Sequence, residues 1–282
     1  MTEPLEFFRE LMRTAPFQPA TNLWRAVELA AVQQHGLPGG RGLDLGCGDG
    51  KLTVIIDAAT APTTPRRWIG VDIDPQETAQ ARSTGLYATV HTGSAQDIRE
   101  APGSMDFVFS NSVLEHIESI DEVLAEAARL LKPGGRFIAT VPGPGFHLAL
   151  RGPLGPTPRE DYLREVDERC AHLRYWSATE WRQQLARHGL RLDSAVGYLS
   201  PALARRWELL SNMTGGMLYK VFRGRSRPIE IQRRLGLRQG RAGIPGRLGE
   251  WAVPALAWGC ALNAAPLDPE ISAGLLVDAV KA

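Results

Sequence analysis

Apolar runs alternate with helical patterns between residues 40 and 142, and this alternation constrains the fold more than any other feature. Residues 42–46 read GLDLG and precede a helical stretch from Lys51 to about Ala59. The next run reads WIGVDI, and the helical stretch after it opens with Pro75, which suits a first helical turn. Later runs read LYATVHT, MDFVFSN and GRFIATVP. Strands that alternate with helices at this spacing predict an α/β fold with a parallel sheet.

The flanking segments predict three structural parts. A helix over 19–35 that stops at Gly36 belongs to an N-terminal helical lid. About 70 residues between two late strand patterns are mainly helical, far longer than a hairpin connection, so we interpret them as an inserted acceptor cap or a dimer interface. The lid, the α/β core and the insertion are expected over residues 1–36, 37–200 with 270–282, and 201–269.

The net charge of +1 conceals a basic block in this insertion. Residues 201–250 contain ten Arg and one Lys against three Glu, a local balance of +8. Such a block is typical of a solvated helical face, and it also fits peripheral contact with an anionic or lipid surface. No recognition module accompanies it, so a specific nucleic-acid partner is not expected.

The cysteines indicate a reducing compartment. Cys47, Cys170 and Cys260 are odd in number and form no C-x-x-C pair, which predicts neither a disulfide framework nor a zinc site. The N-terminus lacks the apolar core of a signal peptide, so a cytoplasmic protein is expected. Trp251 to Leu267 form a charge-free segment of 17 residues with two prolines. This is short of the roughly 20 residues of a membrane span, and a buried helix is expected there.

A glycine-rich turn follows the first expected strand. Gly46, Gly48 and Gly50 are spaced G-x-G-x-G, which matches neither the dinucleotide fingerprint nor the P-loop. Glycines let a backbone approach a ligand closely, at the sheet edge where doubly wound folds bind ligands. Asp44 and Asp49 would repel a pyrophosphate beside this turn. The turn therefore favours a ligand with a positive charge and an amino-acid end.

A second acidic residue ends the next expected strand. Asp72 lies where a carboxylate accepts both hydroxyls of a ribose. Asp74 is the alternative ligand, although its place before Pro75 predicts a helix cap. The ligand is thus expected to carry a ribose and a cationic or zwitterionic group.

Five motifs follow one another in the chain: GLDLGCGDG, GVDID, GSAQDI, MDFVFSNSVLEHI and RLLKPGGRFIATVP. In this set and order the chain resembles the class I S-adenosylmethionine-dependent methyltransferases of the small-molecule type. The resemblance covers about residues 40–142 and is weaker over 172–190. It implies a Rossmann-like seven-stranded mixed sheet of order 3-2-1-4-5-7-6, with helices on both faces and strand 7, here GLLVDAVKA, antiparallel.

The resemblance also implies the cofactor, S-adenosyl-L-methionine, with S-adenosyl-L-homocysteine as product, and the residues that bind it. Asp44 and the glycine turn would surround the methionine part, Asp72 would hold the ribose, and Asn111 would offer its backbone carbonyl to the ammonium. Ser94 replaces a frequent Asp beside the adenine, so Asp97 or water is the alternative partner there. The full expected set is Asp44, Gly46, Cys47, Gly48, Gly50, Asp72, Ile73, Ser94, Ala95, Asn111 and Arg25. For Arg25, a salt bridge from its helix to the core, with Glu28 left outside, is the alternative to the methionine carboxylate.

The expected chemistry is in-line methyl transfer to a small-molecule acceptor, in specialised metabolism or on a glycan or lipid precursor. His116 is the candidate general base; the alternative is that Glu115 and His116 only shape the pocket. His147, Tyr175 and Trp176 are the candidate acceptor residues, with packing as the alternative role. The mixture of aromatic, methionine and basic residues in 201–250 favours an amphipathic or phosphorylated acceptor.

Three other functions remain open from the residues alone. The chain could methylate RNA or protein, it could keep the fold as a catalytically silent cofactor-binding module, or it could be a dehydrogenase, which the G-x-G-x-G spacing disfavours. No spacing of Cys, His and carboxylate residues predicts a metal site.

Overall fold

The computed structural model of the chain describes residues 4–60, 62, 64–153, 155–214, 216, 244–257, 262 and 265–282. The chain forms two compact units, each assembled from several stretches. Unit 1 comprises residues 1–31, 144–172 and 198–274, and unit 2 comprises residues 32–143, 173–197 and 275–282. Most of the predicted N-terminal lid and the described residues of the predicted insertion therefore belong to the same unit.

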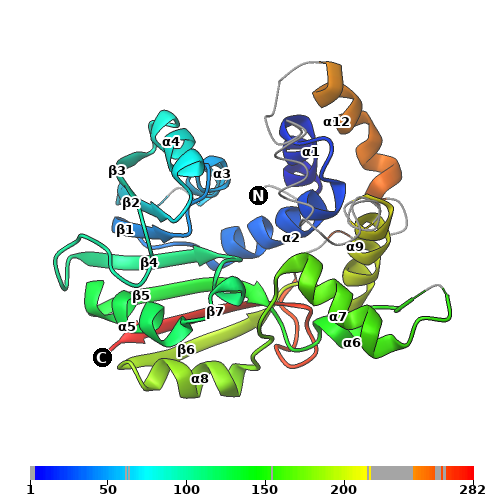
Figure 1. Cartoon of the computed structure of the whole chain (residues 1–282). Helices are drawn as coiled ribbons and strands as arrows, with labels where there is room; N and C mark the ends of the chain where they lie inside the picture. The colour runs from blue at the N-terminus through cyan, green and yellow to red at the C-terminus, as the bar shows by residue number, and fades with distance from the viewer. Residues whose placement is uncertain are drawn as a thin grey trace. The chain divides into compact units, whose positions relative to one another are not determined.

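Unit 2 is built on one sheet of seven strands in the order β3-β2-β1-β4-β5-β7-β6 (Figure 1). The strands are β1 (Gly40–Leu45), β2 (Arg66–Asp72), β3 (Tyr87–Thr92), β4 (Met105–Asn111), β5 (Leu131–Pro142), β6 (Leu190–Gly197) and β7 (Gly274–Lys281). β1 pairs in parallel with β2 and β4, β2 with β3, and β4 with β5, whereas β6 and β7 are antiparallel. The predicted fold and strand order are confirmed. The residues Pro133, Gly134 and Gly135, around the start of the run GRFIATVP, lie inside β5, where the register with β4 shifts.

The helical segments of unit 2 connect these strands. They are α3 (Lys51–Ala59), α4 (Pro75–Ser83), the 3-10 turn η1 (Leu114–His116), α5 (Ile120–Leu130) and α8 (Ala178–Ala186). α4 begins at Pro75 as predicted, and the Asp74 side chain caps it by accepting from the backbone N–H groups of Gln76 and Glu77. Ser177 and Glu180 form a capping box at the start of α8.

Alternate residues of the central strands face two different layers of helices. Leu43, Ile69 and Val108 belong to an apolar core that also contains buried residues of α5 and α8. On the other face, Trp68 lies edge-on to Phe107, with ring centroids 5.1 Å apart, and its indole N–H donates to Asp57 of α3 at 2.8 Å. Side chains alternate between the two faces along each strand, so both faces of the sheet carry apolar residues that helices cover.

Unit 1 contains helices from distant parts of the chain. They are α1 (Pro4–Thr14), the first part of α2 (Pro19–His35), α6 (Phe146–Ala149), α7 (Arg159–Cys170), α9 (Pro201–Met213) and α12 (Ile244–Ala257). Trp24, Phe146 and Trp207 make edge-to-face contacts with centroids 5.3–6.0 Å apart. Phe146 is buried and begins a short helix, α6, within a Gly/Pro-rich segment.

The charge-free segment that starts at Trp251 differs from its prediction. Its described helical part completes α12, yet Trp251 is 75% exposed rather than buried. Gly246 and Gly249 of α12 lie close to α1, since a Cβ at either would lie 2.4 Å from an α1 backbone oxygen. Among the described residues, no helix has the length and apolar character needed to cross a membrane. Cys260 and most of the basic block, residues 217–243, lie outside the described residues.

A buried carboxylate ties three segments of unit 2 together. Asp278 of β7 is fully buried and lies 2.8 Å from the His35 ring nitrogen. The Arg136 guanidinium of β5 donates to both Asp278 oxygens, from Nε at 3.0 Å and from a second nitrogen. Because the ion pair is bidentate, it holds β7 beside β5, and the Arg136 charge compensates the buried charge of Asp278.

We expect Asp278→Ala to lower the free energy of unfolding by about 3–5 kcal/mol, because Arg136 loses its buried partner. Asp193→Ala is the matched control: Asp193 is 42% exposed and lies 3.6 Å from the same guanidinium, so its loss should cost below about 1 kcal/mol. Urea denaturation of both variants measures the difference. Equal losses would contradict the central role of Asp278.

Candidate functional site

Three neighbouring parallel strands of unit 2 bring polar residues to one edge of the sheet. β2, β1 and β4 are adjacent, and Asp72 and Asn111 are the last residues of β2 and β4. Asp44 lies one residue before the end of β1, in register with Gly70 of β2 and Phe109 of β4. The carboxyl ends of adjacent parallel strands are where open α/β sheets bind ligands.

The glycine turn after β1 needs its glycines for different reasons. Gly46, Gly48 and Gly50 all have positive φ values, of 80°, 52° and 75°. A Cβ on Gly46 would lie 2.5 Å from the Val113 side chain, whereas a Cβ on Gly48 would meet nothing within 4 Å. Gly46 therefore lets the β4–η1 loop pack against the turn. Gly48 keeps a position open.

Asp72 holds this turn in place. Its Oδ2 accepts from the Gly48 backbone N–H at 2.9 Å, and its Oδ1 accepts from the Asp74 N–H at 2.9 Å. An ionised carboxylate has about four acceptor sites, so Asp72 retains capacity for further hydrogen bonds. The next residue, Ile73, is 76% exposed, which is unusual for an aliphatic side chain at the end of a buried strand.

Asp44 is buried and bound by two hydroxyl groups. Its Oδ2 accepts from Thr53 Oγ1 at 2.6 Å and from the Tyr87 hydroxyl at 2.6 Å. Burial is the main cause that raises the pKa of Asp44 to about 6; the two hydroxyls oppose this, and the charge of Asp72 adds to it. Neither Thr53 nor Tyr87 was predicted as a site residue.

Cys47 lies inside the turn and is buried. The backbone N–H groups of Gly46 and Cys47 both donate to Val71 O at 2.9 Å, which fixes the turn to β2. Burial, together with the charges of Asp44 and Asp72, raises the pKa of the Cys47 thiol. The thiol is therefore an inert part of the packing at this position.

The residues predicted to line the adenine lie after β3. Ser94 Oγ donates to the Gln96 side chain at 3.0 Å and accepts from the Gln96 N–H at 3.2 Å, so it is engaged in its own turn. Ala95 packs against the apolar core. Asp97, the alternative partner, is exposed.

Asn111 is followed by a strained residue. Ser112 has φ 49°, a left-handed conformation that few non-glycine residues adopt, and its N–H donates to Thr140 O at 2.8 Å. Strained backbone of this kind clusters at functional sites. The strained residue therefore marks the end of β4 as a further part of the same candidate ligand-binding edge.

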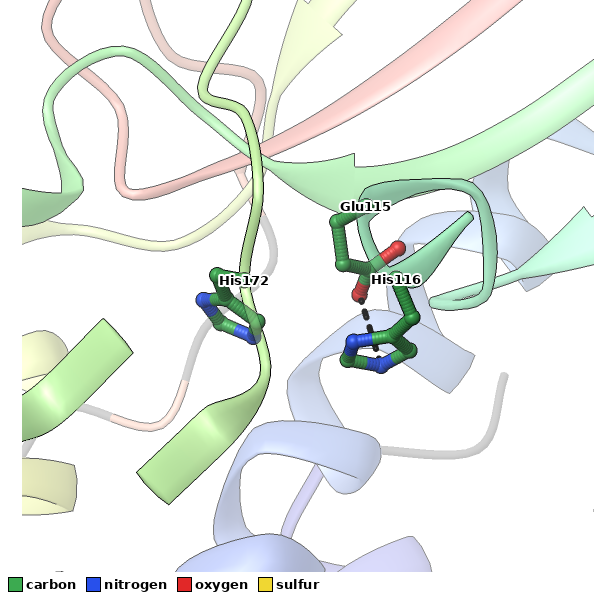
Figure 2. A group of neighbouring side chains, drawn as sticks. All are labelled: Glu115, His116 and His172. Atoms are coloured by element: carbon green, nitrogen blue, oxygen red, sulfur yellow. Dashed lines mark ion pairs between the residues drawn. The ribbon is translucent and has the colours of Figure 1, made fainter. Parts of the chain in front are cut away.

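His116 is the last residue of η1. Its side chain is 39% exposed, and its Nε2 lies 3.7 Å from Oε1 of the buried Glu115, as the dashed line in Figure 2 shows. The segment before α8 holds the η1 turn in place, because the Leu173 N–H donates to Glu115 O at 2.9 Å. A histidine with an acidic neighbour and an exposed ring has the parts of a general base.

The remaining predicted residues are paired within their own units. In unit 1, Arg25 forms a 2.6 Å ion pair with the fully buried Glu28, which also accepts from the Tyr198 hydroxyl at 3.1 Å. The alternative predicted for Arg25 left Glu28 outside and is wrong on this point, because Glu28 is the buried partner of Arg25. His147, also in unit 1, lies 2.8 Å from Asp167.

In unit 2, Trp176 stacks edge-on against Trp181 at 5.0 Å, and Tyr175 is half-buried beside it in the chain. The packing role named as the alternative for Trp176 thus has a direct contact. The predicted acceptor residues are divided between the two units.

The unit 2 residues fit S-adenosylmethionine chemically. A carboxylate with spare acceptor capacity suits ribose hydroxyls, a second carboxylate suits a cationic methionine end, and an exposed aliphatic side chain suits an aromatic base. The open position at Gly48 leaves backbone accessible between them.

Comparisons with known proteins identify the family of the chain. The family model described as "Methyltransferase domain" matches residues 8–195. An uncharacterized 37.1 kDa protein in a transposon of Streptomyces fradiae is 34% identical over 126 residues, which cover 44% of this chain and 35% of that protein. A ubiquinone biosynthesis O-methyltransferase of Xanthomonas campestris is 35% identical over 189 residues, which cover 59% of this chain and 77% of the relative.

The fold recurs in a solved structure of a methyltransferase. A possible histamine N-methyltransferase from Thermotoga maritima superposes with a TM-score of 0.58 at 18% identity, over 98% of each chain. At that identity the likeness concerns the fold alone. The family match over most of the chain carries the assignment: the chain belongs to the methyltransferase-domain family and is a class I S-adenosylmethionine-dependent methyltransferase.

Proposed function

We propose that this enzyme methylates a hydroxyl group of a small amphipathic molecule. The observation that carries the cofactor half of the proposal is the pair of carboxylates, Asp44 and Asp72, on adjacent strand ends around an open glycine turn. The acceptor half is supported by the O-methyltransferase relative and by the mixed aromatic and basic sequence of 201–250. A phosphorylated acceptor, a homodimer interface and contact of 201–250 with an anionic or lipid surface are further parts of the proposal. The cysteine pattern supports a cytoplasmic setting.

We assign the cofactor's parts to different strands. Asp72 accepts the ribose hydroxyls, and Ile73 covers the adenine together with Ala95. Asp44 faces the cationic methionine end, to which Asn111 offers its backbone carbonyl. Gly46, Cys47, Gly48 and Gly50 form the turn that lets the backbone approach. Ser94 keeps the adenine-side turn closed through Gln96. Arg25 has no part in this assignment, because it is paired with Glu28.

Bound S-adenosylmethionine supplies an electrophilic methyl group, so the protein's task is to position the acceptor and to remove its proton. Positioning alone contributes roughly 7–11 kcal/mol of barrier lowering in well-oriented reactions. His116 takes the hydroxyl proton, and Glu115 stabilises the imidazolium that forms, at the 3.7 Å separation of the resting pair. His147, Tyr175 and Trp176 are proposed to contact the acceptor.

We expect Asp72→Ala to weaken S-adenosylmethionine binding by about 1.5–3 kcal/mol, the scale of hydrogen bonds to a charged group. Isothermal titration calorimetry measures it, and circular dichroism checks that the variant is folded. Asp121→Ala, which removes an exposed carboxylate on α5, is the control and should bind like the wild type. Unchanged affinity of a folded Asp72→Ala protein would remove the ribose assignment.

Asp44 should make the ligand-free protein less stable as pH rises. Its folded pKa of about 6 lies above the ordinary value of 3.8, so the folded state binds the proton more tightly, and stability falls between about pH 4 and pH 6. Asp44→Asn should therefore gain about 1–3 kcal/mol over the wild type at pH 8 and lose that advantage at pH 4.5. Urea denaturation at both pH values measures this difference. A difference that is the same at both pH values would contradict the buried ionised state.

His116→Gln should lower turnover by about 10²–10⁴-fold, the usual contribution of a general base, while cofactor affinity stays within about twofold. Turnover is measured with a hydroxyl-bearing acceptor found by screening. His91→Gln is the matched control, since His91 is a partly buried histidine of β3 paired with Glu100 at 2.9 Å. Full turnover of His116→Gln from pH 6 to 9 would exclude the base.

A further inference from the structure

Tyr87 crosses one strand of the sheet to reach another. It is the first residue of β3, and its hydroxyl donates to Asp44 of β1, although β2 lies between these two strands. The crossing point is Gly70 of β2, the residue in register with Asp44. A Cβ on Gly70 would lie 3.0 Å from Cys47 Sγ and 3.1 Å from two ring carbons of Tyr87, so any larger residue would crowd both side chains.

A second glycine bounds the ring from the ligand turn. Gly50 is the N-cap of α3, and a Cβ there would lie 2.8 Å from Tyr87 Cε2. The third glycine of the G-x-G-x-G turn is therefore required by the tyrosine as well as by its φ of 75°. Gly50 and Gly70 together form a slot for one aromatic side chain.

The Tyr87 hydroxyl in this slot is a hydrogen-bond donor to Asp44. Tyr87 and Thr53 both donate to the same oxygen of Asp44, Oδ2, at 2.6 Å. Among the described residues, no hydrogen bond engages the other oxygen, Oδ1. Two donors on one oxygen fix the rotation of the carboxylate, and they favour its ionised form because an ionised carboxylate only accepts.

The groups around Asp44 oppose ionisation or are remote. Asp72 of β2 adds a like charge, and Cys47 of the turn is neutral. Arg82 of α4 is the cation that acts on this cluster, through Cys47. Burial and Asp44 itself raise the pKa of the Tyr87 hydroxyl, which therefore remains a donor at all physiological pH values. The two hydroxyls are thus the main groups that keep Asp44 ionised.

We propose that Tyr87 is a positioning residue that acts through Asp44. It holds Asp44 ionised and turned so that Oδ1 is free for the cationic methionine end of the cofactor. This inference rests on the proposed assignment of Asp44 to that part of the cofactor. It adds a residue outside the glycine turn to the binding site.

The test is the pH dependence of S-adenosylmethionine affinity in Tyr87→Phe, measured by calorimetry from pH 5.5 to 8.5. Loss of one hydrogen bond to the ionised form should move the fall in affinity to higher pH. The variant should bind within about twofold of the wild type at pH 8 and about five- to tenfold more weakly at pH 6. A role in packing alone would weaken binding equally at every pH. The ligand's own amino group titrates identically in both proteins.

Matched variants separate the hydroxyl from the ring. Thr53→Val should reproduce the pH effect and Thr53→Ser should restore the wild-type profile. Tyr162→Phe removes a tyrosine hydroxyl that donates to Glu208 in unit 1, at 2.7 Å, and should leave the profile unchanged.

Two outcomes overturn different claims. A wild-type affinity that falls at acidic pH, with the same midpoint in Tyr87→Phe, would overturn the positioning role of Tyr87. A wild-type affinity that does not fall as pH drops through 6 would instead overturn the assignment of Asp44 to the cationic end of the cofactor, and with it the proposal.

Discussion

A buried carboxylate at the edge of the sheet is the constraint on which the rest of the site depends. Asp44 has almost no contact with solvent, and desolvation opposes its charge. The chain answers this cost with two hydroxyls from elements on either side, α3 and β3. Space for one of them requires glycine at two positions, in the turn and in β2. The glycine turn therefore also makes room for a group that binds the buried carboxylate of Asp44.

The second carboxylate works differently. Asp72 is not primarily a buried charge but a connector, which joins the glycine turn to the start of α4 through two backbone N–H groups. A ligand held by Asp72 would therefore be placed by the same group that shapes the turn. Asp44 thus needs hydrogen-bond donors that keep it ionised, whereas Asp72 serves to fix the backbone of the glycine turn.

The sequence predicts the parts of this fold that are governed by short-range rules. Pro75 with Asp74 before it, and Ser177 with Glu180 after it, announce helix starts because capping involves only neighbouring residues. The strand order follows from the family resemblance. Tyr87 could not be found in this way, since its contact with Asp44 depends on the register of three strands and on the absence of a side chain at Gly70.

Contacts within unit 1 were hidden for the same reason. Arg25 and Glu28 are three residues apart in one helix, yet Glu28 was expected to lie outside, because its burial and its bond to Tyr198 depend on residues far away in the sequence. The exposure of Trp251 was predicted wrongly, because apolar composition does not reveal which side of a helix its glycines turn toward a neighbour.

The methyltransferase fold does not determine the acceptor. An O-methyltransferase is related in sequence and a possible N-methyltransferase shares the fold, so the atom that receives the methyl group depends on residues other than those that build the fold. His116 and the proposed acceptor residues lie on loops and short helical turns, where such differences are concentrated.

The most direct test of the account is calorimetric titration of the full chain with S-adenosylmethionine, with nicotinamide adenine dinucleotide as the control ligand. The account predicts binding of the first with a dissociation constant on the order of micromolar, and no binding of the second. Binding of the dinucleotide alone, or of neither ligand, would contradict the reading of Asp44, Asp72 and the glycine turn as a methyl-donor site.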